Sequence, residues 1–300
     1  MAVTAGIRRP SLSRTQRRAL VSFLFVVPAL VLFLTFLAIP LVYSAGISLF
    51  RWTGMSEATF MGLENYGRLL TDNVFWLSMK ATVLYALMVI PVTTLASLVA
   101  AIFVNQGLRG TNVFKSLIFI PVITSSVVIA VVWNFIYQGG DVGLLNAVLG
   151  LVGIPGHVWM GDMLTALPAI AVIGVWHRFG WFSVLFLAGL QDIPIEQREA
   201  AEIDGASRWQ VFWHVTLPLL RPTIALVMVL GAIQSFQVFD VVFIMTEGGP
   251  YYSTHVLGYY IWTEAFRGLR MGYASAMSYI LFGSIMIITL IQLRILRPAT

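Results

Sequence analysis

The chain contains no cysteine, only two lysines and few charged residues of either sign. The absence of cysteine excludes disulfides, thiolate catalysis and metal sites built on thiolates. Neither Lys80 nor Lys115 follows a glycine, so the phosphate-binding loop G-x-x-x-x-G-K-[ST] is absent and the chain cannot bind ATP in that way. No His and carboxylate residues share a metal-ligand spacing, so we predict no metal site.

Apolar residues, in contrast, are abundant. Hydrophobic residues make up 59% of the 300 residues and charged residues 10%, and the mean hydropathy is +0.88. An average soluble domain carries about 25% charged residues, so this composition predicts an all-α integral membrane protein. A membrane-spanning helix needs about 20 mostly apolar residues. Six segments meet that requirement: 19–48, 75–104, 113–137, 164–190, 219–245 and 274–296.

The basic residues predict how these spans are oriented. The net charge of +5 comes from arginines near span ends, so it does not indicate nucleic-acid binding. Four regions that alternate with the spans are basic, and by the positive-inside rule they face the cytoplasm together with both termini. Their basic residues are Arg8, Arg9, Arg14, Arg17, Arg18, Arg109, Lys115, Arg198, Arg208, Arg221, Arg294 and Arg297. The exceptions on the outer side are Arg51, Arg68, Arg267 and Arg270, which are accompanied by Glu57, Glu64 and Glu264.

A polar gap between the fourth and fifth spans, residues 191–218, has the pattern of two short helices joined at a glycine. Asp192 is a candidate N-cap with Pro194 in the first turn. Gly205 ends this helix or admits another backbone. Ser207 and Gln210 have the spacing of a capping box, which starts the second helix. We therefore expect a helix–glycine–helix unit, called the elbow below.

The first helix of the elbow has a surface suited to a groove. Glu199 and Glu202 are three residues apart and share a helix face. Ala200 and Ala201 keep the helix thin. An ordinary amphipathic loop between spans is the simpler alternative reading of the same residues.

The spacing within the elbow resembles that of a known family. Glu199-Ala200-Ala201 is followed after three residues by Gly205, and after nine more by Val-Thr-Leu-Pro at 215–218. This is similar to the loop by which permease subunits of bacterial ABC importers dock on their ATPase. Segments 60–66, 246–250, 253–254 and 272–276 extend the resemblance to the carbohydrate-uptake branch, and in particular to the maltose-type first permease subunit without its large outer domain. Glu247 departs from the pattern, because relatives commonly carry a neutral residue before Gly-Gly-Pro.

The resemblance implies a type I ABC importer permease fold with six transmembrane helices and a cytoplasmic coupling helix in the bacterial inner membrane. The expected divisions are a cytoplasmic tail (1–18), a first span with its outer loop (19–74) and a core (75–296) containing the coupling loop (191–218). The implied partners are a second homologous permease, an ATPase dimer that binds ATP and Mg²⁺, and an extracytoplasmic solute-binding protein. The chain itself would carry no cofactor and no catalytic residue. The implied ATPase-docking residues are Glu199, Ala200, Ala201, Glu202, Asp204 and Gly205.

Polar residues within the spans are costly there and typically line a cavity or form a pair. Arg178 lies near the middle of its span, ~20 Å from either end. The resemblance places Arg178 and Trp181 on the wall of the substrate pocket, where an indole can stack on a sugar ring. An arginine paired across two permeases is the alternative. His177 is expected to point elsewhere, as an interface histidine.

Two other spans contribute candidates. Gln234, Gln237 and Asp240 form a polar stripe at three-residue spacing. Gln234, Val238 and Ser126 match pocket positions of the family, although Ser126 also suits close helix packing. Asp240 lies nearer the outer end, where an outer-loop arginine is an alternative partner.

Three functions are compatible with these residues. The first is the translocation subunit of an ATP-driven importer of a mono-, di- or oligosaccharide. The same machinery could carry a glycerophosphodiester or sugar phosphate, because Arg178 could hold a phosphate group. An ion-coupled secondary transporter would need intramembrane carboxylates, of which Asp240 is the one candidate, and would leave the elbow unexplained.

Overall fold

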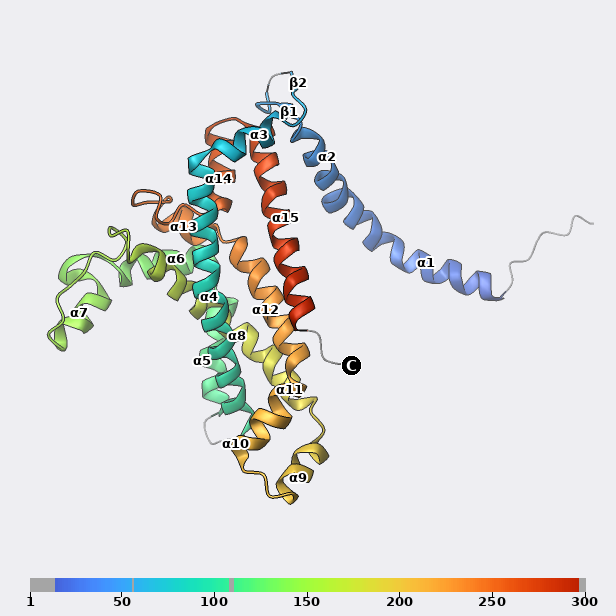
Figure 1. Ribbon diagram of the computed structural model, residues 1–300, viewed down its shortest axis with the longest axis vertical. Coiled ribbons are helices and arrows are strands. Elements are labelled where there is room, and N and C mark those ends of the chain that lie inside the picture. The colour runs from blue at the N-terminus through green and yellow to red at the C-terminus, as the bar shows by residue number, and fades with distance from the viewer. Residues whose placement is uncertain (1–13, 56, 108–110, 297–300) are drawn as a thin grey trace, which may run out of the picture.

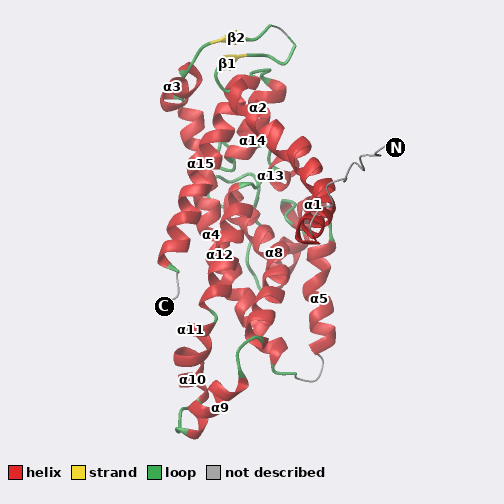
Figure 2. Ribbon diagram, turned by 90° about the vertical axis from the view of Figure 1, so that its right-hand side faces the viewer, coloured by secondary structure: helices red, strands yellow, loops and turns green. Residues whose placement is uncertain are grey.

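The computed structural model describes residues 14–55, 57–107 and 111–296. Arg8, Arg9, Arg109 and Arg297, which enter the predicted orientation, lie outside these residues. The described part is an elongated helical bundle, with a small β-hairpin at one end and the elbow at the other (Figures 1 and 2). The bundle consists of α4 (Asn73–Asn105), α5 (Thr111–Ile123), α6 (Ser126–Ile136), α8 (Ala166–Gln191), α12 (Arg221–Phe236) and α15 (Met271–Ile295).

Shorter elements complete the chain. At the hairpin end are β1 (Phe50–Arg51), β2 (Thr59–Phe60), α3 (Glu64–Thr71), α14 (Leu257–Trp262) and a π-helical turn (Thr263–Arg267), whereas α13 (Asp240–Met245) packs on α6. A 3-10 turn (Gly140–Val142) and α7 (Leu144–Leu151) lie between α6 and α8. The elbow contains α9 (Ile195–Ile203), α10 (Arg208–Val211), a π-helical turn (Phe212–Thr216) and α11 (Leu217–Leu219).

Five helical segments of the described chain are long and apolar enough to cross a membrane: Val21–Ile47, Asn73–Asn105, Ala166–Gln191, Arg221–Met245 and Met271–Ile295. A sixth span is the pair Val113–Ile123 and Ser126–Ile136, which is bent by 105°. Six apolar segments therefore lie where the sequence predicts them, but the third is not one continuous helix. Pro121 lacks a backbone donor, and the Thr124 hydroxyl donates to the Ile120 carbonyl (2.7 Å), so local bonds compete with the helix at this point.

The first span, formed by α1 (Arg14–Phe33), a π-helical turn (Leu34–Ala38) and α2 (Ile39–Ile47), stands away from the bundle (Figure 1). None of its apolar window is buried against the described chain. Its attachment lies at the hairpin end. There β1 pairs antiparallel with β2, and the Asn65 amide donates to the carbonyls of Ser48 (2.8 Å) and Phe50 (3.0 Å).

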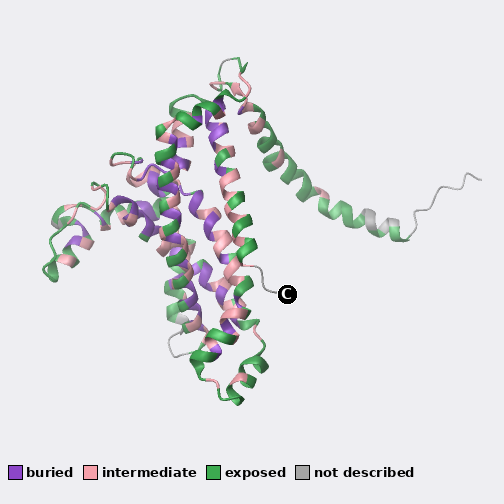
Figure 3. Ribbon diagram, in the orientation of Figure 1, coloured by how far each residue is buried: buried purple, intermediate pink, exposed green. Residues whose placement is uncertain are grey.

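The core of the bundle is centred on α8, which packs between α4, α5 and α12. Buried residues form stripes along the helices rather than a single central layer (Figure 3). Ile170, Ile173, Phe182 and Phe186 of α8 are at most 1% exposed. The Ser97 hydroxyl of α4 donates to the Phe179 carbonyl of α8 (2.9 Å). Such contacts matter because lipid provides no hydrophobic force that would hold one helix against another.

Gly180 is the point of closest approach between α8 and α5. A Cβ atom built at Gly180 would lie 2.3 Å from the Ile118 backbone oxygen. We expect Gly180→Val to separate α5 from α8 and to lower stability by about 1–3 kcal/mol, as overpacking does elsewhere. The measurement is the thermal unfolding of the purified complex in detergent. Gly283→Val is the matched control, because a Cβ at Gly283 of α15 meets nothing within 4 Å; equal unfolding temperatures for both variants would contradict the expectation.

At the hairpin end, Asp72 joins three helices. Its carboxylate caps α4 by accepting from the Val74 and Phe75 amides, and it also accepts from the hydroxyls of Tyr260 (2.7 Å) and Tyr273 (2.5 Å). Burial alone would raise the pKa of Asp72, but these hydrogen bonds outweigh burial and hold it below its ordinary value. The carboxylate therefore stays ionised while it fastens α14 and α15 to the start of α4.

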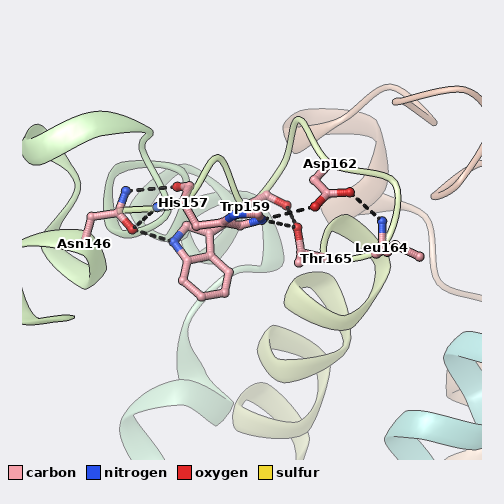
Figure 4. Close-up of polar contacts among 6 residues, drawn as sticks. All are labelled: Asn146, His157, Trp159, Asp162, Leu164 and Thr165. Atoms are coloured by element: carbon pink, nitrogen blue, oxygen red, sulfur yellow. Dashed lines mark hydrogen bonds and ion pairs between the residues drawn. The ribbon is translucent and has the colours of Figure 1, made fainter. Parts of the chain in front are cut away.

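The long connection between α6 and α8 is ordered by one amide (Figure 4). Asn146 donates to the His157 carbonyl (2.9 Å) and accepts from the His157 amide and the Trp159 indole (2.8 Å). His157 in turn contacts Thr165 (3.0 Å) and lies 3.4 Å from a carboxylate oxygen of Asp162. This network folds the connection between α7 and the start of α8, which projects from the side of the bundle (Figure 1).

Candidate functional site

A cavity of about 490 Å³ lies among α4, α5, α8 and α12, beside the interruptions between α5 and α6 and between α12 and α13. All six residues predicted to line a substrate path border it: Ser126, Arg178, Trp181, Gln234, Gln237 and Val238. Its other lining residues include Tyr85, His177, Phe239 and Asp240. The structure thus brings together side chains from three separate spans, while their role in transport stays a prediction.

Arg178 is held within its own subunit by neutral groups. Its guanidinium donates to the Tyr85 hydroxyl (3.0 Å) and to the backbone carbonyls of Gly174 and Gln234 (both 3.3 Å). None of the ion pairs found among the described residues includes Arg178. The guanidinium therefore links α4, α8 and α12 at mid-bundle and keeps its charge at the cavity wall. Tyr85 has no counterpart in the sequence prediction, because one tyrosine on an apolar span carries no periodic signal.

The two interrupted spans meet at the cavity. The Ser126 hydroxyl, at the start of α6, donates to the Asp240 carboxylate at the start of α13 (2.5 Å). The alternative that Asp240 pairs with an outer-loop arginine is wrong. Those arginines have other partners: Arg51 lies 4.0 Å from Glu64, Arg267 3.2 Å from Glu247 and Arg270 3.1 Å from Glu264.

One further expectation needs correction. His177 does not point away from the pocket, because it is among the residues that line the cavity. Glu247 lies on the surface beside Arg267 and is not among the cavity residues, so its departure from the family pattern does not alter the cavity wall.

The elbow projects from the other end of the bundle as two short helices (Figures 1 and 2). No residue of α9 is buried. Gly205 has a φ of +86°, and it ends α9 together with two backbone bonds, from Gly205 to Glu202 (3.1 Å) and from Ala206 to Ala201 (2.9 Å). This is a Schellman ending, so the predicted glycine stop is confirmed. A Cβ at Gly205 would meet nothing within 4 Å.

The caps of the elbow follow the prediction at one helix and not at the other. Ser207 and Gln210 form the predicted capping box at α10. Asp192, however, does not cap α9: it follows the last residue of α8, and Pro194 precedes α9 without a side-chain cap. Continuation of α8 through Gln191 leaves Asp192 too early in the chain for that role. Of the residues predicted to dock on the ATPase, Glu199, Ala200, Glu202, Asp204 and Gly205 are exposed and Ala201 is half-buried.

An apolar bundle, a polar cavity halfway along it and a projecting two-helix elbow define the class of the protein. It is a multi-pass membrane permease with the type I ABC importer fold. The chain belongs to the family described as "Binding-protein-dependent transport system inner membrane component", whose family model matches residues 93–299.

Known proteins resemble almost the whole chain. A probable ABC transporter permease protein of Bacillus subtilis, YurN, is 35% identical over 92% of this chain and 95% of its own length. A trehalose/maltose transport system permease protein of Thermococcus litoralis is 33% identical over 93% of this chain and 94% of its own. A chain of a bacterial alginate ABC transporter, solved in complex with an alginate pentasaccharide-bound periplasmic protein, superposes with a TM-score of 0.81 at 20% identity, covering 94% of this chain and 95% of that one. This last likeness concerns the fold alone.

Proposed function

We propose that the chain is the translocation subunit of an ATP-driven importer that carries an uncharged sugar delivered by a solute-binding protein. Relatives over nine-tenths of the chain include permeases named for trehalose/maltose and for lactose transport, which supports a sugar. The observation that carries the proposal is the cavity, where an indole, two amides and two hydroxyls gather around a space of about 490 Å³. Aromatic faces with converging hydrogen-bonding groups suit a polyhydroxylated ring.

The charges of the cavity favour a neutral substrate. Arg178 is its fixed cation, and Asp240 lies on the same cavity wall. A phosphate or sulfonate placed near Arg178 would also face the Asp240 carboxylate, whereas sugar hydroxyls can donate to Asp240 and accept from Arg178. An anionic substrate is a second candidate, because none of the ion pairs among the described residues includes Arg178 and one relative is named for sulfoquinovosyl glycerol.

The elbow and the termini complete the proposal. The exposed α9 docks on an ATPase dimer, which binds ATP and Mg²⁺, while this chain holds no cofactor and does not hydrolyse ATP. A second permease subunit pairs with it, and the elbow and both termini face the cytoplasm. Arg198, Arg208 and Arg221 in or beside the elbow support that orientation, because basic residues concentrate on the cytoplasmic side.

Reconstitution tests this function. The chain is purified alone, and also with its second permease and ATPase, in proteoliposomes. We expect no ATP hydrolysis by the chain alone, and uptake by the full complex with hydrolysis stimulated by the loaded solute-binding protein. A panel of uncharged sugars, sugar phosphates and glycerophosphodiesters then identifies the substrate. ATP hydrolysis by the chain alone would contradict the assignment of hydrolysis to a separate ATPase subunit. Uptake of only the anionic compounds would contradict the neutral substrate.

A further inference from the structure

A second cavity, of about 680 Å³, lies at the hairpin end, between the start of β1, α3 and the start of α15. Three arginines from separate elements line it: Arg51, Arg68 and Arg270. Two of these three arginines have a carboxylate neighbour, and Glu64 also lines the cavity. Arg51 is 4.0 Å from Glu64, and Arg270 is paired with Glu264, but none of the ion pairs of the described residues involves Arg68, whose recorded contact is the ring of Tyr273 (5.7 Å). The cavity therefore has a surplus of positive charge and fits an anion.

The height of this cavity matches the headgroup layer of a membrane. Arg270 directly precedes Met271, where the last span begins, and Arg51 follows the first span, which ends at Ile47, by four residues. The polar layers of a bilayer extend about 5–7 Å beyond each side of the hydrocarbon. Trp52 and Tyr273, which also line the cavity, are residue types enriched at this boundary.

An apolar groove adjoins the basic cavity. It has a volume of about 450 Å³ and runs along the last turns of α2, beside Val42, Tyr43, Gly46 and Ile47. Trp52 lines both spaces, so the groove and the cavity meet at one side chain. A basic cavity that meets an apolar groove fits an amphiphile with a phosphate headgroup and an acyl chain.

We propose that these two spaces together bind one anionic phospholipid, with its phosphate among Arg51, Arg68 and Arg270 and an acyl chain along α2. The lipid would lie in the leaflet opposite the elbow, and calling it the outer leaflet rests on the proposed orientation. It would also connect the first span to the bundle where direct contacts are few. The site is separate from the sugar cavity, so its failure would leave the transport function untouched.

The test uses the complete importer complex in nanodiscs that contain equal amounts of phosphatidylglycerol and phosphatidylcholine. Native mass spectrometry counts the lipids that stay bound after release from the disc. We expect the wild-type complex to retain phosphatidylglycerol selectively. The double variant Arg51→Gln with Arg68→Gln should reduce this enrichment by about fivefold for each arginine removed. Arg267→Gln is the matched control, because Arg267 is an outer arginine that lines neither space.

A second variant tests the apolar half. A Cβ at Gly46 would meet nothing within 4 Å, so Gly46→Leu fits the fold and fills the groove. It should lower lipid retention without removing any charge. The proposal would be overturned if Gly46→Leu left lipid retention unchanged while the arginine variant lost it and inorganic phosphate competed with the lipid. That combination would show a phosphate site with no acyl chain. Unchanged lipid retention together with weaker capture of the solute-binding protein by the arginine variant would assign the arginines to protein docking instead.

Discussion

Gly205→Asp in the elbow is expected to reduce uptake by at least about tenfold, which corresponds to a loss of about 1.4 kcal/mol in docking. Aspartate tolerates the left-handed backbone better than most residues, and the space around Gly205 within this chain is open, so the elbow itself should still form. The added carboxylate would instead meet the ATPase groove at its closest point. The measurement is uptake by proteoliposomes together with co-purification of the ATPase.

Gly153→Asp is the control for the free-energy cost of placing an aspartate on left-handed backbone. Gly153 also follows a short helix, has a φ of +77° and meets nothing within 4 Å, but it lies in the connection between α7 and α8, away from the elbow. Glu199→Lys tests the charge of the same surface and should also release the ATPase or uncouple hydrolysis from uptake. Normal uptake and normal ATPase retention in both elbow variants would remove the docking role of α9.

Arg178→Ala is expected to lower uptake by about ten- to a hundredfold, because a hydrogen bond to a charged group is worth about 1.5–3 kcal/mol when its partner is otherwise left unpaired. Removing the guanidinium also frees the Tyr85 hydroxyl, which is buried in the core. Trp181→Ala should have a smaller effect in the same direction, since aromatic stacking contributes about 0.5–1.5 kcal/mol. Uptake at saturating loaded binding protein is the measurement.

The assembled state of the complex decides what an effect of Arg178→Ala means. Binding of the second permease and the ATPase should be unchanged if Arg178 acts on substrate. Val172→Ala on the same helix is the control, because Val172 is about half exposed on the surface of α8 and does not line the cavity. Loss of the second permease from the Arg178 variant would support the alternative of an arginine that holds the two permeases together.

Much of this architecture is predictable because it depends on local composition. Span positions follow from apolar length, and the ends of the elbow helices follow from Gly205 and from the Ser207–Gln210 pair, whose bonds are all made within six residues. Five of the six predicted cavity residues came from the family resemblance and Gln237 from the three-residue spacing of polar residues; a fold shared along nearly the whole chain preserves such positions. These correct predictions depend either on contacts between residues close in sequence or on a fold shared with the family.

The missed features depend on how distant segments pack. The 105° bend between α5 and α6 requires Pro121 and Thr124 to act together, and each residue alone is tolerated in a membrane helix. Asp240 enters the cavity because the α12–α13 interruption places it at the start of α13, where its carboxylate accepts from Ser126 at the start of α6, and His177 lines the same cavity from α8. Arg270 lies more than 200 residues after Arg51 and Arg68, so no local sequence pattern predicts that the three line one cavity.

The two interruptions at Thr124–Ser125 and 237–239 also determine where the electrical barrier of the membrane lies. Backbone outside a helix is tolerated at membrane depth where protein buries it or where a water-filled cavity adjoins it, and the cavity borders both interruptions, so water filling the cavity would reach them. The insulating layer through the protein is then thinner than the surrounding bilayer. The membrane voltage consequently falls over the remaining sealed layer, where the field is steeper, rather than evenly along the spans. Arg178 and Asp240 border this wet region, which is why their charges cost less there than at the centre of a lipid-exposed helix.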